Sequence, residues 1–242
     1  TDRSRGLGDV YKRQCLYQER ILLYMNYDSV PLRDFKELND WETVIFVYQS
    51  ALKQVETKID ILNGEFQHRH KYNPIEHVKS RIKTPESIVK KLKRHGYESS
   101  IENMVRYVND IAGIRISCSF TSDIYLIADM ISKQNDLTIL ARRDYMKNPK
   151  KSGYRSYHML VTTPVFLSDS IIDTKVEIQI RTVAQDFWAT LEHKMHYKFE
   201  GDGPDYITKE LRECARYVAE LDTRMEELNN EIQKYGKLSD KK

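Results

Sequence analysis

The stretch 111-IAGIRISCSF-120 alternates apolar and polar side chains over most of its length. Because successive side chains of a β-strand point to opposite faces of a sheet, this pattern predicts a strand that is buried on one face. Such a strand must pack its apolar face against other elements, so the neighbouring segments decide the fold. The predicted buried face carries Ile114, Ile116, Cys118 and Phe120, and the other face carries Arg115, Ser117 and Ser119.

Helical and extended patterns alternate on both sides of this strand. A long amphipathic helix is predicted from an N-cap at Asn39-Asp40 to Gly64. Thr84 and Pro85 begin a shorter helix that ends before residue 96. Further helices are predicted from residue 100, over 121–134, 182–199 and 205–235, and further strands over 75–83, 137–143, 155–165 and 174–181. Alternating strands and helices predict an α/β (α+β) fold, a sheet with helices packed against it.

The composition indicates one soluble globular core. The chain has 242 residues and a mass of 28.7 kDa, and 40% of its residues are hydrophobic. No apolar run approaches the roughly 20 residues of a membrane helix. Cys15, Cys118 and Cys214 lie far apart, which predicts reduced thiols in a cytoplasmic protein and neither a disulfide nor a zinc site. Residues 1–14 show no helical periodicity, and we expect them to be a non-native or disordered extension.

Two carboxylates are candidates for a metal site. The stretch 176-VEIQIRT-182 alternates, so Glu177, Gln179 and Arg181 share the polar face of a strand. Asp110 stands at the entrance of the strand described above. Two carboxylates on adjacent strands suit Mg²⁺, which takes one or two protein carboxylates and leaves its other positions to water and phosphate. The simpler interpretations are a solvated strand face for Glu177 and a helix-to-strand cap for Asp110.

A basic patch precedes these acids. Residues 79–94 contain seven Lys or Arg and one Glu. Cations and a hydroxyl converge at the N-terminus of the predicted helix in this patch, where the helix dipole already favours anions. Lys and Arg add direct phosphate contacts. The simpler interpretation is a solvated basic helix face. The converging residues are Arg81, Lys83, Ser87, Lys91 and Arg94.

The stretch 151-KSGYRSYH-158 combines flat rings with hydrogen-bonding groups around a single glycine. If Tyr154, Ser156 and His158 alternate on one strand face, a phenol ring and an imidazole project to the same side. A tyrosine stacked on a nucleobase contributes ~1–3 kcal/mol. The simpler interpretation is a pair of half-buried strand residues. Together, the three clusters predict a site for phosphorylated, aromatic, metal-binding ligands.

Six motifs resemble the synthetase domain of the RelA/SpoT alarmone enzymes, and specifically the single-domain small alarmone synthetases. The likeness spans residues 41 to about 235. It implies a nucleotidyltransferase-like mixed sheet of about five strands flanked by helices, with long N- and C-terminal helices. It also implies an enzyme that transfers the β,γ-pyrophosphate of ATP to the ribose 3′-OH of GDP or GTP, making ppGpp or pppGpp. The motifs are R-x-K-x-x-x-S-I-x-x-K at 81, DIAGIRI at 110, RDY at 143, KSGYRSYH at 151, EIQIRT at 177 and FWATLEHK at 187.

We expect four parts in the chain, and the resemblance assigns roles to individual residues by motif. The parts are the extension 1–14, an N-terminal segment 15–38, the synthetase domain 39–204, and a C-terminal helix and tail 205–242. ATP would be bound by Arg81 and Arg115, which sandwich adenine, and by Lys83, Ser87, Lys91 and Arg94 on the phosphates. The acceptor GDP or GTP would be bound by Arg143, Lys151, Tyr154 stacked on guanine, His158 and Gln179. Arg181, Glu192 and Lys194 would support these residues.

Asp110 and Glu177 would be catalytic and would bind Mg²⁺. The resemblance gives Glu177 the role of general base toward the 3′-OH. A carboxylate beside Mg²⁺ has a lowered pKa and is a weak base, so we expect Glu177 to orient the hydroxyl instead. The resemblance also implies a cytoplasmic homotetramer. In members activated by their own product, lysines of the first long helix line the effector cleft. Glu56 and Asp60 stand at those turns here, which disfavours an anionic effector.

Two other functions remain open from the sequence. A toxin branch of similar sequence pyrophosphorylates the 3′-CCA end of tRNA or makes adenosine alarmones; the tyrosine of GYRSYH favours guanosine. The second alternative is an RNA-binding regulator with a degenerate site, which the basic patch at 79–94 would suit. RNA binding is not our prediction, because pure binding has no need of Asp110 and Glu177 among phosphates.

Overall fold

The structure is a computed structural model that describes residues 40–70, 72–198 and 205–239. Its centre is a five-stranded sheet in the order β1-β2-β5-β4-β3. Strands β2 and β5 are parallel and the other neighbours are antiparallel, so the predicted mixed sheet is confirmed. The predicted segments 1–14 and 15–38 lie outside the described residues. The strands are β1 (Ile75–Ile82), β2 (Ala112–Cys118), β3 (Thr138–Asp144), β4 (Tyr157–Phe166) and β5 (Ile171–Thr182).

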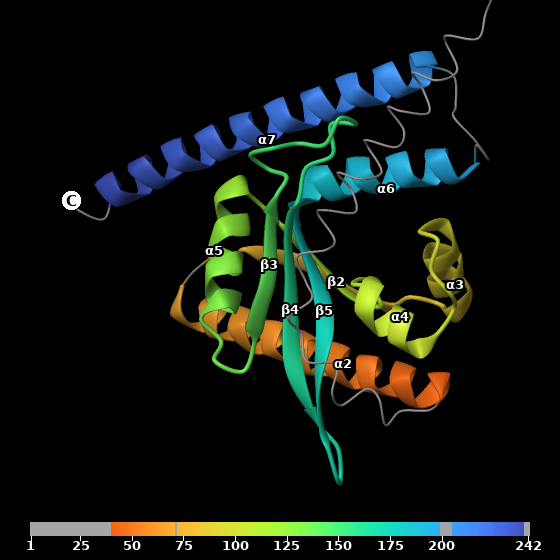
Figure 1. The fold of residues 1–242 in the computed structure, drawn as a ribbon. Helices are drawn as coiled ribbons and strands as arrows, with labels where there is room; N and C mark the ends of the chain where they lie inside the picture. The colour runs from red at the N-terminus through yellow and green to blue at the C-terminus, as the bar shows by residue number, and fades with distance from the viewer. Residues whose placement is uncertain (1–39, 71, 199–204, 240–242) are drawn as a thin grey trace, which may run out of the picture.

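Helices α2 (Trp41–Arg69) and α5 (Thr121–Ser132) pack on the sheet and enclose the main core. Figure 1 shows α2 crossing the sheet and α5 beside β3. The apolar side chains of β5, Val176, Ile178 and Ile180, are fully buried in this core. Their polar neighbours on β5 therefore face the other side, where α3 (Pro85–Arg94), α4 (Ile101–Tyr107) and α6 (Val183–Lys198) leave space for a site.

The predicted helix starts are confirmed by their caps. The Asp40 carboxylate accepts the backbone N–H of Thr43 at the start of α2, at 2.6 Å. Thr84 and Ser100 cap α3 and α4 in the same way, with Pro85 at the first position of α3. A side chain that accepts these otherwise unbonded N–H groups stabilises a helix by ~1 kcal/mol.

The predicted end of the first helix at Gly64 is wrong. Helix α2 continues through Gly64 and ends at Arg69. Gly64 does not adopt the left-handed conformation that ends many helices, because its φ is not positive. A helical glycine costs only about 1 kcal/mol relative to alanine, which the packing of α2 outweighs.

The long helix α7 (Asp205–Ser239) lies across α5 and α6 (Figure 1). Glu226 accepts the N–H of Ser122 in the first turn of α5, at 3.1 Å. Asp222 accepts the hydroxyl of Thr182 and the amide of Gln185 where α6 begins, each at 2.8 Å. Acidic side chains stabilise helix N-termini, so these contacts hold α7 against the N-terminal ends of α5 and α6. The outer face of α7 exposes Tyr217, Leu221, Met225, Leu228 and Ile232.

Within the described ranges, no helix is both long and apolar enough to cross a membrane.

Gly153 brings the loop before β4 against α7, and we expect Gly153→Ala to destabilise the fold. Its φ is +90°, and a Cβ there would lie 2.5 Å from the Cβ of Ala215. Positive φ and overpacking together predict a loss of about 3 kcal/mol in the free energy of unfolding. Urea denaturation of the purified variant measures this loss.

Gly64→Ala is the matched control for this substitution. Nothing lies within 4 Å of a Cβ at Gly64, which is inside α2. Alanine there should raise the free energy of unfolding by up to about 1 kcal/mol. If the two variants shifted stability in the same direction and by the same amount, the close approach of Gly153 to α7 would be wrong.

Candidate functional site

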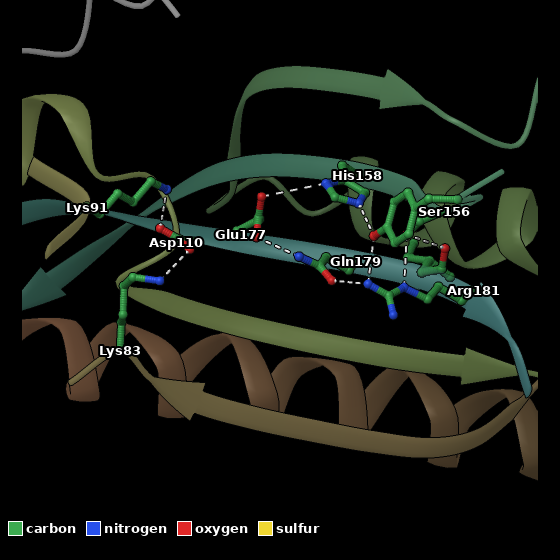
Figure 2. A network of polar contacts seen from close by, with 10 residues as sticks. Lys83, Lys91, Asp110, Ser156, His158, Glu177, Gln179 and Arg181 are labelled. Carbon is green, nitrogen blue, oxygen red and sulfur yellow. Dashed lines mark hydrogen bonds and ion pairs between the residues drawn. The ribbon is translucent and has the colours of Figure 1, made fainter. Parts of the chain in front are cut away.

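The site lies on the polar face of β5, where that strand runs beside β2. Glu177 pairs with Gly113 of β2, and Gln179 pairs with Arg115. Asp110 stands three residues before Gly113, just ahead of β2. The parallel pairing therefore brings the two predicted carboxylates to one place, as Figure 2 shows. The predicted adjacency of their strands is confirmed.

Two cavities meet at these carboxylates. The first has a volume of about 370 Å³ and the second about 210 Å³. Asp110, Glu177 and Gln179 line both. The first cavity is further lined by Lys91, Asn109, Ala141, Arg143, Lys150, Ser152, Tyr154, His158, Met159, Leu160 and Glu192. The second is further lined by Lys79, Ser80, Arg81, Gly113, Ile114 and Arg115.

Asp110 is held between two lysines. Lys83 Nζ lies 3.0 Å from its Oδ2, and Lys91 Nζ lies 2.7 Å from its Oδ1. Burial alone would raise the pKa of Asp110, but the charges and hydrogen bonds of Lys91 and Lys83 outweigh it and lower the pKa to about 2. Asp110 is therefore an ionised carboxylate. Its two lysines reach it from different places, Lys83 from just after β1 and Lys91 from α3.

A fourth charged residue, Lys175, fixes the turn that carries Asp110. Lys175 is 5% exposed and lies on the same face of β5 as Glu177. Its ammonium donates to the carbonyl oxygen of Arg106 at 3.2 Å and to Oδ1 of Asn109 at 2.7 Å. Burial lowers the pKa of Lys175 to about 8. The cation also lies at the C-terminus of α4, where the helix dipole favours positive charge.

Glu177 belongs to a closed ring of polar contacts that Figure 2 draws. Gln179 Nε2 donates to Glu177 Oε2 at 2.8 Å, and Arg181 Nη2 donates to Gln179 Oε1 at 2.6 Å. The same Arg181 nitrogen donates to the Tyr154 hydroxyl at 2.6 Å. Tyr154 Oη lies 2.8 Å from His158 Nε2, and His158 Nδ1 lies 3.6 Å from Glu177 Oε1. The ring fixes both oxygens of Glu177.

The direction of these hydrogen bonds follows from Arg181, which can only donate. Because the Tyr154 oxygen accepts from Arg181, its own hydrogen is available to His158 Nε2. Nδ1 then carries the imidazole hydrogen and points toward Glu177. Burial lowers the pKa of His158, so the ring is neutral at pH 7. Burial would raise the pKa of Glu177, but the contacts with His158 and Gln179 outweigh it and lower the pKa. Glu177 is therefore ionised.

The structure brings most of the predicted phosphate and base contacts to the cavities, but not all. Arg81 and Arg115 both line the second cavity, as a pair that clasps one flat group would. Ser87 and Arg94 are exposed on α3, outside the linings of both cavities, and the Ser87 hydroxyl accepts that of Thr84 at 3.0 Å.

Lys151 and Lys194 are also placed away from the cavities. Both are exposed, and neither lines either cavity. Lys150 lies at the first cavity instead, with Nζ 4.7 Å from the centroid of the Tyr154 ring. Arg143, predicted to contact the acceptor nucleotide, lines the first cavity, and so does Glu192, which was predicted only to support the residues of the site.

The Tyr154 ring makes several contacts that restrict how a base can stack on it. Its ring packs against Trp188, Ala189 and Ala215. Lys150 lies over the ring, so a base that stacked there would displace the ammonium group. Since Lys150 is exposed and can keep its ammonium group in water, this displacement costs little.

Sequence reasoning missed Lys150, Lys175, Asn109 and Asp186. Lys175 could have been predicted, because alternation places it on the same strand face as Glu177. Asp186 was not: it lies in the first turn of α6 and contacts Arg181 across the end of β5. No helix or strand period joins those positions.

The two carboxylates fit a Mg²⁺ ion. Both are ionised, both face the point where the cavities meet, and carboxylate oxygen is the ligand that Mg²⁺ prefers. Within the described part of the chain, no group of three or more His, Cys, Asp or Glu residues forms a metal cage. Two carboxylates without a cage suit an ion that also binds substrate phosphates.

Comparisons with known proteins agree with this geometry. Residues 80–202 match the family described as "Region found in RelA / SpoT proteins". The chain is 45% identical to the GTP pyrophosphokinase YwaC of Bacillus subtilis (strain 168) over 195 residues, which is 81% of this chain and 93% of that relative.

Two solved structures are also similar. Small alarmone synthetase 2 from Bacillus subtilis matches with a TM-score of 0.72 and 44% identity, covering 79% of this chain and 99% of the other. Small alarmone synthetase 1 from Bacillus subtilis, bound to its product pppGpp, matches with a TM-score of 0.75 and 34% identity, covering 80% and 98%.

Proposed function

The chain belongs to the RelA/SpoT family, and on that premise we propose that it is a GTP pyrophosphokinase that makes alarmones. It transfers the β,γ-pyrophosphate of ATP to the ribose 3′-OH of GDP or GTP, giving ppGpp or pppGpp. The observation that carries the proposal is the meeting of two cavities at Asp110 and Glu177. A transfer between two nucleotides requires two neighbouring pockets with the reacting groups at their common border.

The second cavity holds the donor. Arg81 and Arg115 bind the adenine of ATP between them. The ATP phosphates extend toward Asp110, at the border between the two cavities. Lys83 and Lys91 bind the pyrophosphate. Their contacts with Asp110 hold the two ammonium groups near the border between the cavities. Charge neutralisation by such cations is the main need of phosphoryl-type transfers.

The first cavity holds the acceptor. Tyr154 stacks on guanine, and His158 and Gln179 contact the nucleoside while Arg143 reaches its phosphates. Lys150, not Lys151, is the lysine that the loop presents to this cavity. The ring of contacts through Arg181 fixes Tyr154 and Glu177 relative to each other, so the stacked base and the reacting hydroxyl are positioned together.

Glu177 orients the 3′-OH for attack on the β-phosphorus of ATP. The 3′-oxygen forms a bond to that phosphorus, the bond between the α- and β-phosphoryl groups breaks, and AMP leaves. The hydroxyl proton passes to water. Mg²⁺, held by Asp110 and Glu177, would neutralise the phosphate charge and lower the pKa of the hydroxyl. A carboxylate with a lowered pKa aims the hydroxyl well but takes its proton weakly.

We further propose that the enzyme works with Mg²⁺ in the cytoplasm, where ATP and GTP are present. A homotetramer stays a prediction, for which the exposed apolar face of α7 is the available surface. Insensitivity to product also stays a prediction. Glu56 accepts the hydroxyl of Ser80 at 2.9 Å, and Asp60 is exposed one turn later.

A product assay tests the activity. Purified protein is incubated with Mg²⁺, ATP and either GDP or GTP, and the products are separated by anion-exchange chromatography. We expect AMP and a guanosine nucleotide with a 3′-pyrophosphate, in equal amounts. Absence of that nucleotide would overturn the proposal. Transfer of label from γ-³²P-ATP to tRNA, with guanosine nucleotides left unchanged, would favour the toxin branch of the family.

The Tyr154 hydroxyl should contribute to acceptor binding apart from the ring. Tyr154→Phe keeps the ring but leaves Arg181 without an acceptor that it now holds at 2.6 Å. Loss of a hydrogen bond to a charged group predicts a fall of roughly tenfold in kcat/KM for GDP. Tyr154→Ala also removes the stacking surface and should cost a further tenfold or more.

Steady-state kinetics of both Tyr154 variants check this expectation, with the KM for ATP as the internal control. That KM should stay within about twofold of wild type, because Tyr154 does not line the second cavity. A phenylalanine variant with wild-type kcat/KM for GDP would contradict the role of the hydroxyl.

A further inference from the structure

Asp186 joins two arginines: Arg115 lines the second cavity, and Arg181 holds Tyr154 and Gln179, which line the first. Its side chain is nearly buried in the first turn of α6, with 9% of the residue exposed. The same oxygen, Oδ1, lies 3.1 Å from Nη1 of Arg115 and 3.3 Å from Nη1 of Arg181. The two guanidinium groups come from the neighbouring parallel strands β2 and β5. One carboxylate therefore compensates both charges.

Each arginine acts mainly on one of the two cavities. Arg115 lines the second cavity, which holds the donor. Arg181 lies behind the first cavity, where it donates to Tyr154 and Gln179. Asp186 itself lines neither cavity. Its effect on either nucleotide must therefore act through the arginines.

Arg115 depends on this carboxylate for its orientation. Its Nε is buried and has no hydrogen-bond partner among the described residues. The ion pair with Asp186 is thus the contact that fixes a side chain whose outer part is open to the cavity. Without the carboxylate, the two guanidinium groups would repel each other at short range. Arg115 would turn toward solvent, and Arg181 would lose one of the partners that hold it.

We propose that Asp186 is a positioning residue for both substrates. It orients Arg115 in the ATP cavity and, through Arg181, it orients Tyr154 and Gln179 in the GDP or GTP cavity. The inference rests on the proposed function, because it assigns the cavities to ATP and to GDP or GTP. Removing the charge of Asp186 disturbs both cavities from a point that neither nucleotide touches. The signature is a rise in KM for both substrates, whereas a change in Arg115 alone acts mainly on ATP.

The Asp186→Asn variant tests this inference, because asparagine keeps the shape of the side chain and removes its charge. We expect KM for ATP and KM for GDP each to rise about tenfold, the effect of one lost charge-assisted hydrogen bond. Asp222→Asn is the matched control. Asp222 is also a partly buried aspartate that contacts the start of α6, but it lies on α7 and binds Thr182 and Gln185 instead of arginine. Its KM values should stay within about twofold of wild type.

A double-mutant cycle separates positioning from a general loss of structure. In the Arg115→Gln background, Asp186→Asn should raise KM for ATP less than twofold while still raising KM for GDP. Independent, additive effects on KM for ATP would overturn the inference, as would a variant that lowers the melting temperature without changing either KM.

If Asp186→Asn does not fold, Asp186→Glu gives the same comparison with the charge kept and displaced by one methylene. It should also raise KM for both nucleotides, and two unchanged KM values would overturn the inference. Wild-type protein run in parallel separates the two claims. Alarmone made by wild type with no shift in the Asp186 variants removes only this inference, whereas no alarmone from wild type removes the proposed function.

Discussion

Glu177→Gln is expected to lower kcat for alarmone synthesis by about 10³-fold. Glutamine keeps the size of the side chain and can still accept from Gln179, but it loses the charge that we propose orients the 3′-OH and binds Mg²⁺. The free energy of unfolding at pH 7 should fall. The contacts with His158 and Gln179 outweigh burial and lower the pKa of Glu177, so the ionised carboxylate stabilises the folded state, and the neutral amide loses that contribution. Steady-state kinetics and thermal unfolding of the same preparation check both parts.

Glu213→Gln is the control for this substitution, because Glu213 lies on α7 and pairs with Arg216 at the surface. Its kcat should match wild type. A Glu177→Gln enzyme with more than a tenth of the wild-type kcat would show that the carboxylate neither orients the hydroxyl nor holds the ion.

Asp110→Asn should combine a loss of activity with a loss of stability. We expect kcat to fall about 100-fold and the Mg²⁺ concentration for half-maximal rate to rise, because one metal ligand becomes a neutral amide. KM for ATP should not rise, since Lys83 and Lys91 no longer share their charge with a protein carboxylate and are free for the pyrophosphate.

Stability gives the second half of this prediction. The lowered pKa of Asp110 corresponds to about 2 kcal/mol of stability at pH 7. Because the folded pKa is lowered, this contribution is complete above the unfolded value near 4 and is lost as the pH falls toward 2. Asp110→Asn should therefore reduce the free energy of unfolding at pH 7 and make it less dependent on pH in that window.

Asp129→Asn is the matched control for Asp110. Asp129 forms an exposed helical pair with Lys133, and such pairs contribute little. Its stability and kinetics should equal those of wild type. An Asp110→Asn variant with a fivefold higher KM for ATP would contradict the competition between Asp110 and pyrophosphate for the lysines.

Much of the fold was predictable because local patterns and tertiary packing agree. The alternation of 111–120 and 176–182 marks β2 and β5 correctly, and residues with capping side chains begin α2, α3 and α4 where predicted. Gly64 was misleading, because a glycine ends a helix only where the chain turns into positive φ.

The site was predictable where one strand carries it. Glu177, Gln179 and Arg181 follow from the two-residue period of β5, and the pairing of β2 with β5 brings Asp110 to them. The contacts between Arg181, Tyr154 and Asp186 depend on how the loop before β4 and the start of α6 close over that strand. Lys150, and not Lys151, lines the first cavity for the same reason. In a turn, no helix or strand periodicity predicts which way neighbouring side chains point.

The central claim is that Asp110 and Glu177 bind one divalent ion between the two nucleotides. A crystal structure with Mn²⁺, a non-hydrolysable ATP analogue and GDP tests it directly through the anomalous signal of the metal. The account predicts one peak within about 2.5 Å of a carboxylate oxygen of each residue, with the analogue in the second cavity and GDP in the first. A peak bound by phosphates alone, or by only one of the two carboxylates, would contradict it.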